Sequence, residues 1–195
     1  GTGLKADYFN DDALGRALDV IAEHDPSRVA AHIFIPIANE IGQLGRIRRL
    51  DSTTFSVEGK YEGFENTDET PQLVKLTQGF SKKNRPDLKQ VILSLVTSGK
   101  AGVPIWSESL SGNESDKKSF HETINKVNEF EKQLLDAQPV KLWVADSALY
   151  SEKYLLKRNG DIDFSWITRV PETLNESKKL VSKPESEISW KILNN

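Results

Sequence analysis

Two aspartates lie in or directly after runs of apolar and β-branched residues, where an ionisable side chain is unexpected. Asp51 lies inside the run 46–57, and Asp146 ends the nearly continuous apolar run 140–145. Either carboxylate could cap a turn or a following helix, and for Asp146 this is the simpler interpretation. Asp51 is harder to explain in this way, because it lies within its predicted strand rather than at the end of it.

The two carboxylates would be neighbours if these two strands paired in parallel, although they are 95 positions apart in the sequence. Two carboxylates that close repel each other unless one is protonated or a divalent cation lies between them. Oxygen ligands suit Mg²⁺ or Mn²⁺, and two ions about 4 Å apart can activate a water or a 3′-hydroxyl for attack on a phosphodiester. Asp51 and Asp146 are therefore a candidate metal centre, with two unrelated caps as the alternative.

A basic segment is the second feature that could serve such chemistry. Residues 71–100 carry six Lys and Arg against one Asp, a local net charge of +5 in a chain whose total is −3. A charged run is usually a solvated loop, but beside a carboxylate–metal centre it would hold a phosphate backbone. The residues that we consider for DNA contacts are Lys82, Lys83, Arg85 and Lys89.

The composition excludes several other kinds of site. The 195 residues include no Cys and only three His, so disulfide frameworks, thiolate zinc sites, cysteine nucleophiles and His-rich metal sites are ruled out. No Walker loop, G-x-G-x-x-G or G-x-S-x-G sequence occurs. No run approaches the roughly 18 apolar residues of a membrane helix, and no signal peptide is visible. We therefore expect a cytoplasmic protein without membrane contact.

The hydrophobic periodicity predicts an α/β protein. Two helices are expected before residue 45, the second over residues 29–44 and ended or kinked by Pro36. The early strands read as an antiparallel meander, and the apolar run before Asp146 reads as a buried parallel strand. The expected later elements are strands over 46–57, 73–80, 90–97 and 102–110, a helix over 116–137, a strand over 140–145, a helix over 151–158 and a strand over 164–170.

Five motifs occur in order along the chain and together resemble a known family. They are LDSTTF (50–55), GFSKKNRPDL (79–88), LSGNESD (110–116), VADSALY (144–150) and WITRVP (166–171). The chain resembles the DDE transposases of bacterial insertion sequences, in the branch named after insertion sequence four. The similarity runs from about residue 9 to residue 181.

The resemblance implies a ribonuclease-H-like fold, a mixed sheet with antiparallel first strands and parallel later strands, flanked by helices. It implies Asp51 as the first and Asp146 as the second catalytic, metal-binding carboxylate. In the family these two and a later Glu hold two Mg²⁺ ions, with Mn²⁺ as a possible substitute. The complete protein then cuts the transposon ends and joins them to target DNA.

The implied partners are double-stranded terminal repeats of the insertion sequence in the bacterial nucleoid and, for the full-length protein, a second copy. Arg85 and its neighbours lie where family members approach DNA.

The chain departs from the family at the third acid. Family members place this Glu in a Tyr-x-x-Arg-x-x-x-Glu pattern after a β-rich insertion, and no such pattern occurs here. We therefore expect an N-terminal helical segment (1–45), an incomplete catalytic core (46–171), and the start of the insertion or a disordered tail (172–195). The expected function is a transposase core fragment, Mg²⁺-dependent in its complete form and poorly active or inactive alone. The alternatives are a non-catalytic DNA-binding or regulatory remnant and a compact nuclease that uses two acids.

Overall fold

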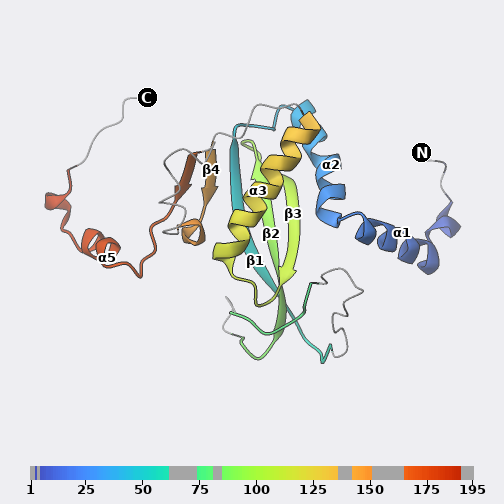
Figure 1. Cartoon of the computed structure of the whole chain (residues 1–195), viewed down its shortest axis with the longest axis horizontal. Helices are drawn as coiled ribbons and strands as arrows, with labels where there is room; N and C mark the ends of the chain where they lie inside the picture. The colour runs from blue at the N-terminus through green and yellow to red at the C-terminus, as the bar shows by residue number, and fades with distance from the viewer. Residues whose placement is uncertain are drawn as a thin grey trace.

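A five-stranded mixed sheet forms the centre of the molecule (Figure 1). The computed structural model describes residue 3 and residues 5–61, 74–80, 85–135, 142–150 and 165–189. The elements are η1 (Ala6–Phe9), α1 (Asp11–Glu23), α2 (Pro26–Glu40), β1 (Ile47–Val57), β2 (Lys89–Ser98), β3 (Val103–Ser111), α3 (Asp116–Leu135), β4 (Leu142–Ala145), η2 (Ser147–Leu149), β5 (Ser165–Thr168), α5 (Asn175–Val181) and η3 (Glu185–Glu187).

The strand order is β3-β2-β1-β4-β5. β1, β2 and β3 form an antiparallel meander, whereas β4 pairs in parallel with β1 and β5 in parallel with β4. This order and these directions are those of a ribonuclease-H-like sheet, so the predicted fold class is confirmed. No helix in the described parts of the chain is long and apolar enough to cross a membrane.

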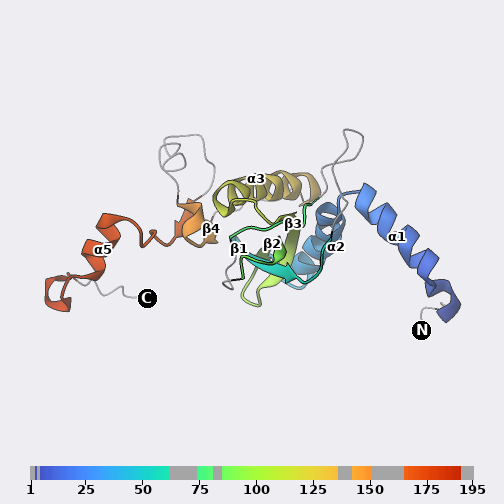
Figure 2. The same cartoon turned by 90° about the horizontal axis from the view of Figure 1, so that it is seen from below.

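One face of the sheet is covered by α2 and α3. Along β1 the even-numbered residues from Arg48 to Thr54 are buried and the odd-numbered residues are exposed, as period-2 alternation requires. Figure 2 shows α3 lying across the strands and α2 alongside β3. The side chains that form the common core are Ala31, Ile35 and Ala38 from α2, Leu50, Val96, Ile105, Trp106 and Trp143 from the strands, Phe120, Ile124, Val127 and Phe130 from α3, and Leu149.

The two N-terminal helices start where their sequences provide caps. The Asn10 side chain accepts a hydrogen bond from the backbone N–H of Ala13 at 2.9 Å, and Asp25 accepts one from that of Ser27 at 3.0 Å. Asp25 has a φ of 59°, which turns the chain sharply between α1 and α2. Of the two effects expected of Pro36, it does not end the second helix, because α2 continues to Glu40. The burial of Ile35 and Ala38 on either side of the proline holds the helix against the core.

The prediction of a strand over residues 73–80 is also wrong. Residues 74–80 form a strap across the end of the sheet, and their one ladder contact is a bridge between Thr77 and Gln90. Hydrogen bonds to side chains and backbone outside the sheet ladder hold the strap in place, and a strand-like sequence pattern does not predict them. In one of these, the backbone N–H of Gly112 donates to the carbonyl oxygen of Lys75 at 3.1 Å. The predicted helix over 151–158 lies outside the described residues.

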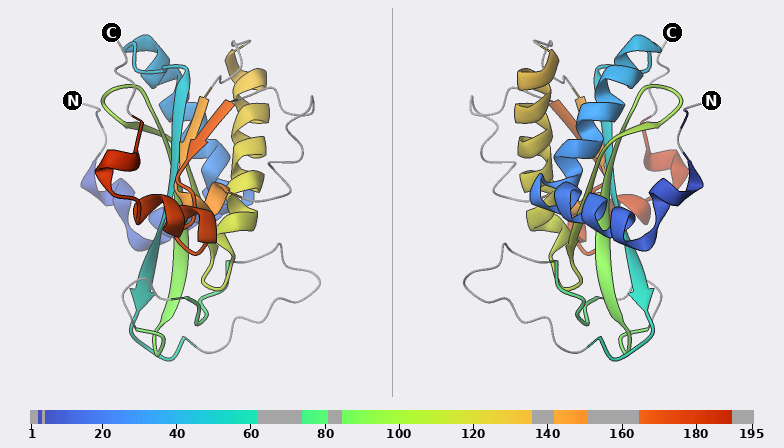
Figure 3. Two further views of the ribbon diagram at one scale, coloured as in Figure 1. Left: turned by 90° about the vertical axis from the view of Figure 1, so that its left-hand side faces the viewer. Right: turned by 90° about the vertical axis from the view of Figure 1, so that its right-hand side faces the viewer.

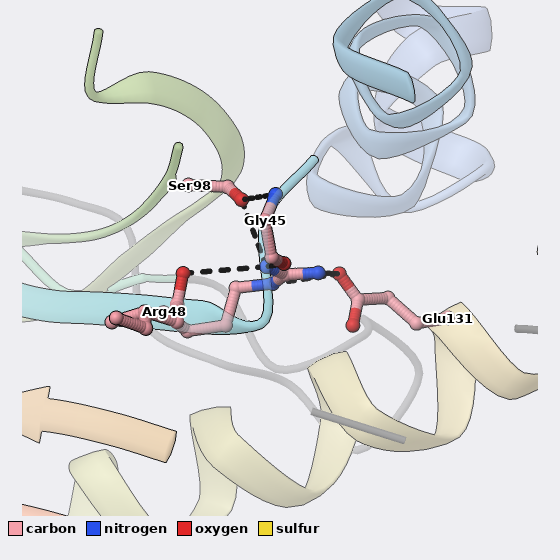
Figure 4. Close-up of polar contacts among 5 residues, drawn as sticks. Gly45, Arg48, Ser98 and Glu131 are labelled. Atoms are coloured by element: carbon pink, nitrogen blue, oxygen red, sulfur yellow. Dashed lines mark hydrogen bonds and ion pairs between the residues drawn. The ribbon is translucent and has the colours of Figure 1, made fainter. Parts of the chain in front are cut away.

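A buried ion pair fixes the start of β1 (Figure 4). The Arg48 guanidinium donates to Glu131 Oε1 of α3 from Nη2 at 2.8 Å and from Nε at 3.0 Å, and Nη1 donates to Ser98 Oγ of β2 at 2.8 Å. Nη1 also bonds the carbonyl of Gly45. The Arg48 network (Arg48, Glu131, Ser98 and Gly45) thus joins β1 to β2 and α3, three residues before Asp51.

Candidate active site

Asp51 and Asp146 each come directly after the last residues that pair β1 with β4, at the parallel junction of the sheet. The ladder between β1 and β4 runs from Ile47 opposite Leu142 to Leu50 opposite Ala145. Asp51 follows Leu50 within β1, and Asp146 follows the last residue of β4, so the parallel pairing of strands on which the predicted site depends is present. Two segments 95 positions apart therefore bring two acids to one place on the sheet.

Each carboxylate is exposed and makes one local hydrogen bond. Asp51 Oδ1 accepts from the backbone N–H of Ser52 at 2.8 Å, and Asp146 Oδ1 accepts from that of Ala148 at 2.9 Å. Asp146 is thus the N-cap of η2, which agrees with the interpretation of this aspartate as a helix cap. Capping and metal binding are compatible, because a carboxylate has two oxygens with about four lone-pair sites between them.

The chemistry of these two side chains fits a hard cation with oxygen ligands. Asp51 lies on β1 and Asp146 directly after β4, and both carboxylates are open to solvent rather than sealed in the core. Among the described residues, no group of three or more His, Cys, Asp or Glu side chains is arranged to hold a metal ion. The described residues thus gather no complete set of metal ligands around Asp51 or Asp146.

A hollow of about 600 Å³ opens beside Asp146. It lies between the ends of the strands and the start of α3, and its border includes Thr54, Phe80, Glu114, Asp146 and Thr173. Phe80 is 87% exposed, which leaves a flat aromatic surface at the rim. The hollow is large enough to admit part of a polymeric substrate next to one of the two carboxylates.

Two glycines let the strap approach the sheet closely enough to form this hollow. A Cβ atom on Gly79 would lie 1.9 Å from the carbonyl oxygen of Gly112, and one on Gly112 would lie 2.1 Å from that of Gln90. The buried Gln90 amide donates to the carbonyls of Gly112 at 2.8 Å and of Phe80 at 3.2 Å. These contacts hold Phe80 at the rim of the hollow.

Of the four basic residues predicted to contact DNA, the structure describes Arg85 and Lys89, and both are hydrogen-bonded within the chain. Lys82 and Lys83 lie outside the described residues. The exposed Arg85 guanidinium forms a two-pronged ion pair with Asp87, with Nη2–Oδ2 2.7 Å and Nε–Oδ1 2.9 Å. This hydrogen bond raises the pKa of Arg85 and lowers the pKa of Asp87. The Lys89 ammonium donates to the backbone carbonyls of Lys60 and Tyr61.

Sequence reasoning missed the hollow and the role of Phe80 at its rim. Phe80 and Glu114 fall in motifs that the sequence singles out, but they are 34 positions apart, and the sequence places Phe80 at the end of a predicted strand and Glu114 just before a predicted helix. The signal that joins them is the pair of glycines, Gly79 and Gly112. The sequence could suggest that each glycine lies close to another backbone segment, but it could not say which segment that is.

Neither a family model nor a curated protein matches the sequence, but eight chains of solved structures do. The Mos1 transposase paired-end complex with the left transposon end is 14% identical with a TM-score of 0.41, and the match covers 75% of this chain and 43% of that chain. The piggyBac transposase synaptic complex with hairpin DNA is 8% identical with a TM-score of 0.44, with coverages of 85% and 34%. The chain spans less than half the length of these solved chains.

Proposed function

We propose that the chain is part of the catalytic core of a DNA transposase, of the insertion-sequence-four type. The observation that supports the proposal is the parallel β1–β4 ladder, whose last pair is Leu50 and Ala145, the residues directly before Asp51 and Asp146. The five sequence motifs support it independently of the geometry, because Asp51 and Asp146 are the two positions where the family resemblance expects its first two acids.

In the proposed reaction, Asp51 and Asp146 bind and orient divalent cations at the scissile phosphodiester. When bound, Mg²⁺ or Mn²⁺ would supply charge neutralisation and lower the pKa of the attacking water or 3′-hydroxyl. Lys82, Lys83, Arg85 and Lys89 hold the DNA backbone near the carboxylates. The substrate is double-stranded DNA carrying the terminal repeats of the mobile element.

The proposed site needs a further acidic ligand beyond the two aspartates. A two-metal site with one carboxylate missing leaves positive charge poorly balanced, so the two aspartates alone should bind metal weakly. We accordingly expect this chain by itself to cut and join DNA poorly or not at all.

Mn²⁺ binding to the whole chain, followed by electron paramagnetic resonance, tests the assignment directly. Asp51→Asn and Asp146→Asn each retain a side-chain oxygen for the bonds to Ser52 and Ala148. We expect each variant to weaken Mn²⁺ binding at least tenfold, because each removes a charged ligand. Asp19→Asn, an exposed acid on α1, is the matched control and should leave Mn²⁺ affinity unchanged.

Two results would contradict the proposal. Unchanged Mn²⁺ affinity in both variants would show that these carboxylates are caps only. Efficient Mg²⁺-dependent strand transfer by this chain on terminal-repeat DNA would contradict the requirement for a further ligand.

A second candidate function is a DNA-binding or regulatory protein without catalysis. The absence of a metal-binding group of three or more such side chains among the described residues favours it. This function predicts salt-dependent DNA binding that survives Asp51→Ala and Asp146→Ala but falls when Lys82, Lys83 and Arg85 are replaced. Failure to bind DNA even at low salt would remove this candidate.

A further inference from the structure

The backbone of Asp146 has less support from the sheet than the backbone of Asp51. Asp51 lies inside the 11-residue strand β1, within an antiparallel ladder to β2 that runs from Arg48 to Val57. Asp146 instead comes directly after Ala145, the last residue of the four-residue strand β4. Figure 3 shows the short strands β4 and β5, drawn in orange, beside each other. The position of Asp146 therefore depends on hydrogen bonds outside the β1–β4 and β4–β5 ladders.

Two local hydrogen bonds of Asp146 shape the turn that follows it. Its Oδ1 accepts from the backbone N–H of Ala148 at 2.9 Å, and its carbonyl oxygen accepts from that of Leu149 at 3.2 Å. Leu149 is buried in the core, so the last residue of η2 is anchored by packing. The two local bonds fix the shape of the turn, but they do not attach its first residue to the neighbouring strand.

The hydroxyl of Thr168 makes this attachment. Thr168 is the last residue of β5, is half-buried and pairs with Ala145. Its Oγ1 donates to the carbonyl oxygen of Asp146, which has two lone pairs and so can accept from Leu149 and Thr168 together. The carbonyl oxygen of Arg169, a second acceptor for the same hydroxyl, is 3.4 Å away, which is long for an O–H donor. The hydroxyl thus extends the contact between β4 and β5 by one residue, to the aspartate.

These bonds act on the Asp146 carboxylate through its backbone. The hydroxyl of Thr168 fixes the peptide from which the side chain projects, and the bond from Ala148 to Oδ1 fixes the rotation of the side chain. None of the described residues donates a hydrogen bond to the second oxygen, Oδ2. A ligand that is oriented before binding loses less conformational freedom when the cation arrives, and partners that orient a metal ligand contribute to metal affinity.

We propose that Thr168 is a positioning residue, whose hydroxyl holds the Asp146 backbone so that the carboxylate is oriented for a divalent cation. This inference rests on the proposed function, because that function makes Asp146 a cation ligand. Thr168 acts through Asp146 and is not itself a ligand.

Amide hydrogen exchange in the metal-free chain tests the positioning by itself. Thr168→Val removes the hydroxyl, keeps the shape of the side chain and suits a strand, whereas Thr168→Ser keeps the hydroxyl. We expect the N–H of Ala148, followed by NMR, to exchange about threefold faster or more in Thr168→Val, as one lost hydrogen bond would cause. In Thr168→Ser it should exchange nearly as in the unmodified chain. Unchanged exchange in Thr168→Val overturns the proposal.

Mn²⁺ binding followed by electron paramagnetic resonance tests what the positioning does for the site. We expect Thr168→Val to weaken Mn²⁺ binding about three- to tenfold, less than Asp146→Asn does, and Thr168→Ser to restore most of the affinity. The urea midpoint of Thr168→Val should equal that of the unmodified chain. Thr97→Val is the matched control, since Thr97 is a half-buried threonine of β2, which β1 separates from β4. It should leave Mn²⁺ affinity unchanged.

These variants separate the inference from the proposed function. If Asp146→Asn weakens Mn²⁺ binding and Thr168→Val does not, the proposed function stands and the positioning role of Thr168 is wrong. If Asp146→Asn leaves Mn²⁺ affinity unchanged, the proposed function is wrong and this inference falls with it. A loss of affinity that Thr168→Ser does not restore, that Thr97→Val shares, or that comes with a lower urea midpoint makes Thr168 a structural residue only and also overturns the proposal.

Discussion

At the scale of single residues, the Arg48–Glu131 ion pair is buried in the core of the described structure. Arg48 is 3% and Glu131 6% exposed, so both charges have been removed from water. Burying an ion pair costs desolvation free energy that the attraction often only balances. The pair positions three elements, since its bonds reach β2, α3 and the chain entering β1.

Burial raises the pKa of Glu131, and the nearby Arg48 opposes this only in part. A raised pKa means that the folded state holds the Glu131 proton more tightly than the unfolded state does. Protonated Glu131 therefore adds to the free energy of unfolding. This contribution is fully present below the ordinary pKa of 4.5 and is lost as the pH rises through the raised pKa.

We therefore predict that Glu131→Gln is more destabilising at acid than at neutral pH. Urea unfolding gives the free-energy difference between wild type and variant at each pH, and this difference should shrink as the pH rises. Glu129→Gln, on the exposed side of the same helix, controls for the loss of one negative charge. A difference that grows with pH would mean that the attraction to Arg48 outweighs desolvation.

At the scale of elements, the strap over residues 74–80 depends on backbone contact rather than on side-chain packing. Gly79 and Gly112 face backbone oxygens closer than any Cβ atom could tolerate. The strap in turn presents Phe80 at the hollow beside Asp146. Replacement of either glycine should therefore move the strap away from the end of the sheet.

We predict that Gly112→Ala lowers the free energy of unfolding by about 1–3 kcal/mol, the usual cost of overpacking. Gly15→Ala is the matched control, because a Cβ at this helical glycine meets nothing within 4 Å. It should instead stabilise α1 by about 0.5–1 kcal/mol. Chemical denaturation and circular dichroism measure both effects, and equal effects of the two substitutions would contradict the close approach.

The sequence predicted the elements whose patterns are repetitive and local. The buried side of α3 followed from apolar residues at helical spacing, and β1 to β3 followed from β-branched runs between turns. The 74–80 strap was misread as a strand, because its partners are the backbone of Gly112 and the side chain of Ser111, which are distant in sequence. Asp51 and Asp146 could be chosen from the sequence, but their adjacency required the parallel pairing of β1 and β4.

At the scale of the whole molecule, the sheet is covered on one face and open on the other in the described structure. The covered face carries the core, while Asp51 lies on the open face together with exposed apolar side chains such as Phe55 and Ile167. A carboxylate on the covered face would lose its hydration, as Glu131 does. The open face keeps Asp51 accessible to solvent.

This asymmetry predicts that Ile→Ala lowers the free energy of unfolding by different amounts on the two faces of the sheet. Ile105→Ala removes a side chain that is 0% exposed and should cost about 2–5 kcal/mol, since it leaves a cavity. Ile167 is 55% exposed, so Ile167→Ala should cost less than about 1 kcal/mol, mainly through lower strand propensity. Urea unfolding of the two variants at equal protein concentration measures both costs. If Ile167→Ala costs as much as Ile105→Ala, the open face is buried against protein in solution, and Asp51 would then lie at an interface rather than on a free surface.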